Sequence, residues 1–549
     1  MRAYRYFLTV FFSSLLTMPF YGFSQASVYD VVIYGGTAAG FTAAIQVAKL
    51  GKKVALLEPG NHMGGIGIDG LGGTDIDNHK NFRNSPAVGG LALEFYKRIA
   101  KTYGRSEAFE KALKDHTRDP RLWKFESSVA ERIIRNWLLE YKVDLYYGRR
   151  LKEGEGAVQK NGSRILAIVA ENGGVFKARV FIDATMEGDL LAAAGVTTVT
   201  GREANAQYNE SFNGIRGVTD HAQFQVKVDP YIIPGNPASG LLPTMQDEPL
   251  GIPGSADDHL QAYCFRMCLT NIPENRIPFT KPANYDRSQY EIYLRYEKAG
   301  GKLYTPAYDL PNHKTDLGAW HDLSHNLYGM NAAYPGGNYA TRKAILDQHR
   351  WYTQGLFYFL ANDPEVSEPI RNAWSRAGLC KDEFADNEGW PRMFYVRDAR
   401  RMVSDYVITE QMGRRQHPTP VADPVAVAYW PMDIHSVRRI VRDGYAYNEG
   451  AVFREQDWRP FGISYRSLIP KINECTNLLT PSCISSSHIA YGAIRIEFTY
   501  MSLGQACGAA ASIAIDENVP VQKIRYGKLK RCLSNGKQVL DANKLEIQE

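Results

Sequence analysis

Glycines near the N-terminus have the spacing of a phosphate-binding turn. The run Gly35-Gly36-Thr37-Ala38-Ala39-Gly40 is followed, at the end of the next apolar stretch, by Glu58. Glycine permits a tight turn, a helix N-terminus presents free amides to a pyrophosphate, and an acid can accept hydrogen bonds from ribose hydroxyls. The pattern predicts dinucleotide binding, although Thr37 stands where a middle glycine is usual. The alternative is a glycine turn that binds nothing.

A second glycine-rich segment follows at residues 63–74 and includes Gly64, Gly65 and Gly70. Small residues let a flat ring lie against the backbone, so we interpret this segment as a wall of the cofactor site. The alternative is a mobile surface loop, which would usually carry more Ser, Pro or charge.

The surrounding patterns predict an α/β fold. A β-branched strand at 28–34 leads into the glycines, an amphipathic helix ends at Gly51, and a strand follows at 54–57. Further on we expect a helix at 125–141, a strand at 143–147 and a hairpin around 172–174. A strand that ends at Asp183 then enters a turn and a new helix. This order predicts a doubly wound, Rossmann-like domain.

Two further sets of residues form recognisable motifs. The first is Phe181-Ile182-Asp183-Ala184-Thr185-Met186-Glu187-Gly188-Asp189-Leu190, with Gly201-Arg202-Glu203. The second, toward the C-terminus, is Tyr465-Arg466-Ser467-Leu468-Ile469-Pro470, Asn477-Leu478-Leu479, Ile484-Ser485-Ser486-Ser487-His488, Arg495 and Gly504-Gln505-Ala506-Cys507-Gly508. Together these motifs resemble a bacterial family of FAD-dependent oxidoreductases that includes relatives of the flavin-containing subunit of heterodisulfide reductase. The resemblance spans about residues 29–520.

The resemblance implies non-covalent FAD in a discontinuous domain with an inserted α+β substrate or cap domain. The expected divisions are a signal peptide at 1–26, FAD-binding parts at 27–204 and 456–525, a substrate domain at 205–455 and a tail at 526–549. A helix that begins near Ser502 would point its N-terminus at the flavin. Beyond the glycine turn, Glu58, Gly64, Gly65 and Gly70, the cofactor-binding residues would be Asp183, Ala184, Thr185, Gly188, Asp189, Gly504, Gln505 and Ala506.

The same resemblance places His488 and Arg495 beside the isoalloxazine. His488 would act as the base while a hydride passes to or from flavin N5, and Arg495 or Arg466 would stabilise negative charge. A buried structural histidine is the alternative for His488, and covalent FAD through His62 is left open. The rival functions are a non-redox isomerase or lyase, and a catalytically silent flavin-containing binding protein.

The composition limits which ligands, cofactors and electron partners we expect for this protein. The formal charge of +5 comes without a long basic run, which argues against nucleic acid and favours a small-molecule substrate. No second nucleotide motif is present, so we expect an electron partner other than NAD(P). The seven cysteines match no zinc or iron–sulfur spacing, so neither a metal nor a cluster is expected, and Cys507 is expected to be a buried, inert thiol.

Residues 205–455 are rich in Tyr, Trp, Pro and Asn, as at 326–331 and 334–339. This composition suits either a carbohydrate-like ligand or an irregular, loop-rich domain. For Arg397-Asp398-Ala399-Arg400-Arg401 we expect surface ion pairs, and the alternative is that these arginines bind a carboxylate of the ligand.

The N-terminus has the composition of a secretory signal peptide. Arg2 and Arg5 precede an apolar run at 7–20, and small residues lead to Ala26. The run is shorter than the roughly 20 residues of a membrane-spanning helix, which is the alternative. We therefore expect a periplasmic or secreted protein without a membrane span after cleavage.

Overall fold

The computed structural model describes residues 28–545, and the predicted signal peptide lies outside these residues. Within them, a seven-stranded sheet has the order β3-β2-β1-β6-β5-β4, with β18 also paired to β6. Strands β1, β2, β3, β6 and β18 are mutually parallel, whereas β5 is antiparallel to both of its neighbours, β6 and β4. The strands of this sheet are β1 Val28–Tyr34, β2 Val54–Leu57, β3 Asp144–Tyr146, β4 Val158–Asn161, β5 Arg164–Val169, β6 Val175–Asp183 and β18 Leu478–Leu479.

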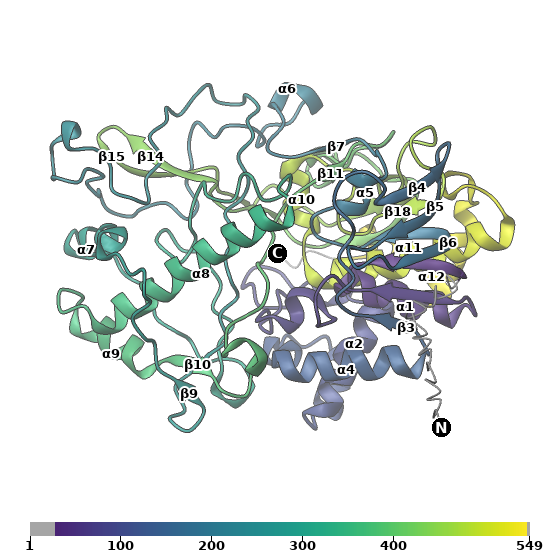
Figure 1. The fold of residues 1–549 in the computed structure, drawn as a ribbon, viewed down its shortest axis with the longest axis horizontal. Coiled ribbons are helices and arrows are strands. Elements are labelled where there is room, and N and C mark those ends of the chain that lie inside the picture. The colour runs from purple at the N-terminus through teal and green to yellow at the C-terminus, as the bar shows by residue number, and fades with distance from the viewer. Residues whose placement is uncertain (1–27, 546–549) are drawn as a thin grey trace, which may run out of the picture.

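Helices cover this sheet and form a second region of the molecule. Figure 1 shows the purple N-terminal elements and the yellow C-terminal helices on one side, and α7, α8 and α9 on the other. The described helices are α1 Ala38–Lys49, α2 Gly90–Thr102, α3 Ser106–Lys114, α4 Ser127–Glu140, α5 Asp189–Ala193, α6 Asn205–Tyr208, α7 Glu291–Lys298, α8 Tyr339–Asn362, α9 Glu368–Arg376, α10 His488–Ile494, α11 Glu497–Glu517 and α12 Tyr526–Asn535.

Small sheets make up the remaining regular structure. The described strands outside the large sheet are β7 Thr198–Val199 with β11 Arg401–Met402, β8 Leu269–Thr270 and β9 Arg276–Ile277 with β10 Gly378–Cys380, β12 Pro424–Ala428 with β17 Phe461–Ser464, β13 Met432–Ile434 with β16 Val452–Arg454, and β14 Arg438–Arg442 with β15 Tyr445–Glu449.

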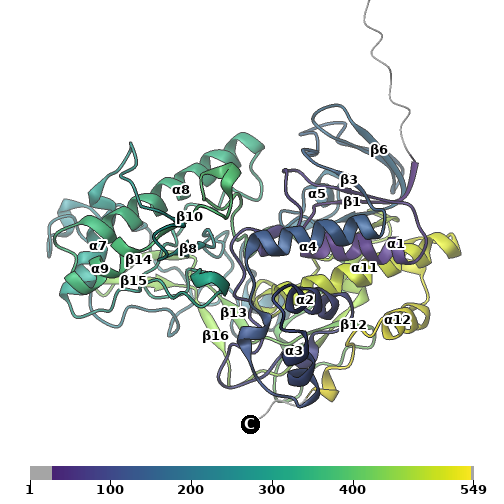
Figure 2. The ribbon, with the colours of Figure 1, turned by 90° about the horizontal axis from the view of Figure 1, so that it is seen from below.

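Two large apolar cores correspond to two lobes. The sheet lobe contains α1, α2, α4 and α11 together with buried residues between 408 and 434, and the distal lobe is built around α7, α8 and α9. Figure 2 shows α1, α4 and α11 running alongside one another, with the distal lobe on the opposite side. The segment 205–455, expected to be one substrate domain, is therefore divided between the lobes: much of residues 228–399 packs in the distal lobe, and buried residues between 408 and 434 pack in the sheet lobe.

Two glycines explain how α11 approaches α1 so closely. A Cβ added at Gly504 would lie 2.1 Å from the Ala39 carbonyl oxygen, and one at Gly508 would lie 2.6 Å from that of Ala43. Such distances lie far inside van der Waals contact, so backbone meets backbone along this face. Helix α1 is consequently buried on nearly all sides from Ala38 to Val47, which a surface helix would not be.

The structure confirms the predicted strands at 28–34 and 54–57, the helix between them and the hairpin of β5 and β6. The helix expected near Ser502 instead begins at Glu497, because Arg495 ends α10 and extended Ile496 separates the two helices. Among residues 28–545, no helix has both the length and the apolar character that crossing a bilayer requires.

Candidate cofactor site

A narrow cavity lies where α1 and α11 begin. Thr37, Ala38 and Ala39 line it from α1, and Glu497 and Tyr500 line it from the first turn of α11. The first amides of a helix have no acceptor within the helix. Two helix N-termini therefore direct partial positive charge toward one space, which favours an anionic group there.

The glycine turn is required by packing as well as by any ligand. Gly35 has φ +104°, and a Cβ there would lie 2.7 Å from the Thr185 amide nitrogen. A Cβ on Gly40 would lie only 1.9 Å from the Gly35 carbonyl oxygen, and one on Gly36 would lie 2.8 Å from Glu58 Oε2. These glycines let β1, β6 and α1 meet at one point.

Thr37 has a function that the usual glycine could not supply. It is the N-cap of α1, and its hydroxyl accepts a hydrogen bond from the Gly40 amide at 3.3 Å. The same hydroxyl donates to the Ala184 carbonyl at 2.7 Å. The departure from the glycine motif therefore ties α1 to the end of β6, while Thr37 still lines the cavity.

Glu58 lies at the end of β2, beside the glycine turn. Its carboxylate accepts hydrogen bonds from the amides of Gly36 at 2.8 Å and Gly60 at 2.7 Å. Burial raises its pKa to about 7, against the opposing effect of these two amides. The acid is thus next to the turn, where it could accept hydrogen bonds from a ribose.

The predicted residues at the end of β6 form a rigid turn. Asp183 accepts hydrogen bonds from the Thr185 hydroxyl at 2.7 Å and the Leu191 amide at 2.9 Å, and burial raises its pKa to about 6. Gly188 has φ +71° and donates to the Thr185 hydroxyl. Both oxygens of Asp189 accept from Arg342, at 2.6 and 2.7 Å, so Asp189 links this turn to α8.

The second glycine-rich segment packs against the start of α1. The Gly64 amide donates to the Gly36 carbonyl at 2.6 Å, and a Cβ on Gly65 would lie 3.1 Å from the Thr37 Cα. Ile66, in the same segment, lines the cavity. A Cβ on Gly70 would lie 1.8 Å from the Arg266 carbonyl, so that glycine permits contact with residue 266 instead.

The predicted residues of α11 hold helices together. Gly504 contacts α1, and Gln505 Oε1 accepts from the Leu91 amide at 2.8 Å, near the start of α2. Ala506 is fully buried. None of the three lines the cavity, so a cofactor contact for them stays a prediction. It is the first turn of α11, from Glu497, that lines it.

Glu497 is a functional candidate that sequence reasoning missed. Its side chain lines the cavity, and burial raises its pKa to about 8, with the nearby Asp75 acting in the same direction. The carboxyl is therefore protonated at neutral pH. The sequence signal that could have identified it is an acid between two apolar residues, Ile496 and Phe498, close to the predicted Arg495.

Two tyrosines complete the polar wall. The Tyr395 hydroxyl accepts from Arg495 Nη1 at 3.0 Å, which leaves its own proton available to the cavity. Tyr500 lies 2.7 Å from the Tyr491 hydroxyl, which itself donates to Ser482 O. Because Tyr491 has one proton, Tyr500 must donate to it.

The predicted catalytic residues are not all brought together. Arg495 is buried and contacts the cavity through Tyr395, and its Nη2 donates to Asp433 O at 2.9 Å. His488 is buried with its Nδ1 2.8 Å from Asp398, and it does not line the cavity. Arg466 is half-exposed and paired with Asp423 at 3.1 Å, so we do not retain it as a candidate.

Three other expectations can be compared with the structure. Both ring nitrogens of His62 face carboxylates, Glu131 at 2.6 Å and Asp386 at 2.9 Å. The expectation of surface ion pairs at 397–401 was wrong for Arg397 and Arg401, which are fully buried because internal backbone carbonyls accept their hydrogen bonds. Burial raises the pKa of the Cys507 thiol, as expected for an inert cysteine.

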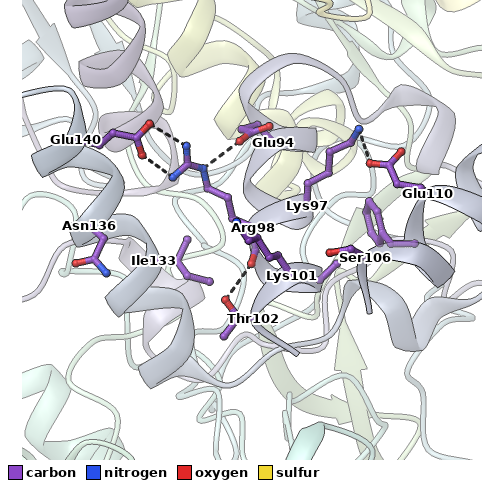
Figure 3. A pocket seen from close by; sticks show the side chains of 12 residues that line it. Glu94, Lys97, Arg98, Lys101, Thr102, Ser106, Glu110, Ile133, Asn136 and Glu140 are labelled. Carbon is purple, nitrogen blue, oxygen red and sulfur yellow. Dashed lines mark hydrogen bonds and ion pairs between the residues drawn. The ribbon is translucent and has the colours of Figure 1, made fainter. Parts of the chain in front are cut away.

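A larger hollow lies between α2, α3 and α4, away from these groups (Figure 3). Five of its charged side chains are already paired: Arg98 with Glu94 at 3.0 Å and Glu140 at 2.8 Å, and Lys97 with Glu110 at 2.8 Å. The cavity at α1 and α11 instead combines helix N-termini with protonated acid and phenol groups. The glycines of the turn and Glu58 do not line the cavity but lie beside it, at the start of α1, and with the free α1 amides they fit a dinucleotide such as FAD.

The parallel sheet, the glycine turn and the acid after β2 define a Rossmann-like dinucleotide-binding protein. A family model described as FAD dependent oxidoreductase matches residues 30–533. The chain belongs to this family and is an FAD-dependent oxidoreductase. A search of curated protein sequences found no significant match.

Several solved structures match part of this chain, and in the three that follow the match covers less than two thirds of the other chain's length. L-proline dehydrogenase from P. horikoshii is 16% identical over 33% of this chain and 59% of its own, with a TM-score of 0.25. Thioredoxin reductase from T. acidophilum is 16% identical over 35% and 39% of the two chains, with a TM-score of 0.17. L-amino acid deaminase from Proteus vulgaris is 16% identical over 35% and 64%, with a TM-score of 0.22.

Proposed function

We propose that this protein is exported and uses non-covalently held FAD to oxidise or reduce a small, hydroxylated organic substrate, carbohydrate-like or a hydroxy acid. When bound, FAD supplies a two-electron acceptor or donor for hydride at N5. The observation that carries the proposal is the cavity at the starts of α1 and α11, whose wall holds a protonated acid and a phenol. Such groups suit a reaction in which a hydroxyl proton must move.

The residues of the cavity have two functions: some can donate protons, and others exclude water. Glu497 holds a proton on its carboxyl at neutral pH, and Tyr395, fixed by Arg495, can donate one from its hydroxyl. Apolar side chains, including Ile66 and Met393, line the rest of the wall and exclude water. Exclusion of water strengthens each of these polar interactions.

The proposed domain plan also has structural support. Strand β18 adds to β6, and α11 packs on α1, so segments from both ends of the chain build the sheet lobe. The distal lobe then corresponds to an inserted substrate or cap region. Two of its amide side chains bind internal backbone carbonyls, Asn326 that of Ala319 at 3.1 Å and Asn331 that of Gln261 at 2.8 Å, which favours the loop-rich interpretation of residues 326–339.

Export and the electron partner can be tested on the secreted protein. Signal-peptide cleavage after Ala26 predicts a mature protein that begins at Ser27, which intact-mass measurement of the protein from the periplasm or medium would show.

We expect oxygen, a quinone or a small redox protein to exchange electrons with the protein in place of NAD(P). Acid precipitation should release all the flavin into the supernatant, whereas yellow pellets would indicate a covalent bond.

The deciding experiment follows the absorption of the FAD-loaded protein anaerobically during addition of sugars, glycosides and hydroxy acids. Bleaching of the flavin bands by one class would support the proposal and identify the substrate class. Turnover of a substrate without any electron acceptor and without net bleaching would instead favour the isomerase or lyase alternative. Tight binding of a compound with neither bleaching nor turnover would favour the silent binding protein.

A further inference from the structure

Two buried cysteines lie opposite each other on neighbouring strands of the sheet formed by β8, β10 and β9 in the distal lobe. Strands β8 and β10 are antiparallel with Leu269 opposite Leu379, so Cys268 stands opposite Cys380. Their sulfur atoms are 3.7 Å apart, and both residues are buried. Directly opposed residues of an antiparallel pair have Cα atoms about 4.5–5.5 Å apart, within the range that a disulfide requires.

We propose that Cys268 and Cys380 form a disulfide in the exported protein. The two thiols lose two protons and two electrons, and one S–S bond forms. The electrons reduce the disulfide of a thiol–disulfide oxidant to its dithiol through a mixed-disulfide intermediate. Only rotation of the two side chains is needed, because the strands already hold the cysteines opposite each other.

The remaining described cysteines have other surroundings. Cys264 Sγ accepts from Arg397 at 3.3 Å, and Cys483 Sγ donates to Thr185 O at 3.4 Å. Within residues 28–545, Cys268 and Cys380 are the one pair of sulfurs within hydrogen-bonding distance of each other. Oxidation should therefore give a single intramolecular product.

The bond would fasten a junction between the lobes. Just after β10, Glu383 accepts from the Ser128 amide of α4 at 2.9 Å and pairs with buried Lys314 at 2.8 Å. Lys314 also pairs with Glu126, just before α4, at 2.7 Å. A cross-link between β8 and β10 therefore fixes the strand that presents Glu383 to α4.

The same bond would steady one wall of the cavity. The chain segment that enters β8 carries Cys264, whose carbonyl accepts from the Tyr395 amide at 2.8 Å. Tyr395 lines the cavity. Since Cys268 lies on this segment, the disulfide would hold the backbone against which residue 395 is positioned. We expect its reduction to speed the loss of FAD.

Peptide mapping of the mature, FAD-loaded protein tests the pairing. The protein is isolated from the periplasm or medium without reductant and denatured in the presence of an alkylating reagent. We expect one cross-linked peptide pair containing Cys268 and Cys380, and alkyl labels on the other five cysteines. Labels on both Cys268 and Cys380, or a link from either to another cysteine, would overturn the proposal.

Thermal unfolding and flavin release provide the second readout. The two cysteines are 112 residues apart, and a cross-link over so long a loop restricts the unfolded chain strongly. We expect dithiothreitol to lower the Tm by roughly 3–8 °C and to speed flavin release. The Cys268→Ala/Cys380→Ala variant should resemble the reduced protein and not respond to dithiothreitol, whereas the control Cys532→Ala should respond like wild type. An equal response in the double variant would contradict the assignment.

Discussion

Replacement of Glu497 by glutamine tests the protonated acid at the cavity. The amide has nearly the same shape but is neutral at every pH. In the folded protein the Glu497 pKa is about 8, against an ordinary value of 4.5. Between these values the folded chain holds a proton that the unfolded chain has lost. The contribution of Glu497 to the free energy of unfolding of the wild type therefore falls as pH rises through this window.

The size of the effect follows from the two pKa values. The group's contribution changes by about 2.5 kcal/mol between pH 5 and pH 7, at up to about 1.4 kcal/mol per unit. Glu497→Gln removes this loss, so the variant should gain stability relative to wild type by about that amount over the same interval. Urea unfolding of the FAD-loaded proteins at both pH values measures it.

A glutamate at the other end of the same helix provides the control. Glu517 is paired with Arg525 at 2.7 Å and Lys528 at 3.1 Å, and the hydrogen bond from Arg525 lowers its pKa. Glu517→Gln should therefore show no gain in relative stability between pH 5 and pH 7. If Glu497→Gln behaved in the same way, Glu497 would be ionised in the folded protein and the reasoning would fail. If the acid transfers a proton in the reaction, turnover of Glu497→Gln should also fall about 10²- to 10⁴-fold with FAD retained.

Three further substitutions test the site. Gly504→Ala should lower the free energy of unfolding by about 2–4 kcal/mol, because the added Cβ meets Ala39 O at 2.1 Å; unchanged denaturant unfolding would contradict the close helix contact. Thr37→Val should cost about 1–2 kcal/mol through loss of the α1 cap and should reduce the flavin-to-protein absorbance ratio, whereas Thr37→Ser should retain both. His488→Asn should lower the Tm more than the turnover, since His488 is buried against Asp398; loss of turnover with unchanged Tm and flavin content would restore its predicted role as base.

The sequence predicted β1 and α1 correctly, because the local residue pattern of each element also determines how it packs. The β-branched run before Gly35 is typical of a buried strand and corresponds to β1. The apolar spacing after Gly35 is typical of a helix and corresponds to α1. The start of α11 was misplaced because residues 489–515 are almost continuously small or apolar. Such a run has no hydrophobic periodicity that could indicate the break between two helices at Ile496.

The cavity wall shows a different limit of sequence reasoning. Tyr395 reaches the cavity because its amide pairs with the carbonyl of Cys264, far away in the chain, and no local pattern encodes that contact. Buried Arg397 was misjudged for the same reason, since its partners are carbonyls of distant residues. His488 illustrates the converse: a recognisable motif placed it in the right segment, but its side chain is directed to Asp398.

The contact between α1 and α11 also determines when this protein can fold. Lys52 and Asp516 form an ion pair across 464 residues of chain, and the face of α1 that Gly504 and Gly508 contact is covered by α11. Contacts between such distant residues slow folding, because a long loop must close before any burial is gained. At about 5–20 residues per second, the ribosome delivers α11 only tens of seconds after α1. The nascent N-terminal unit therefore remains incomplete during synthesis, which keeps it in a state that a chaperone can bind.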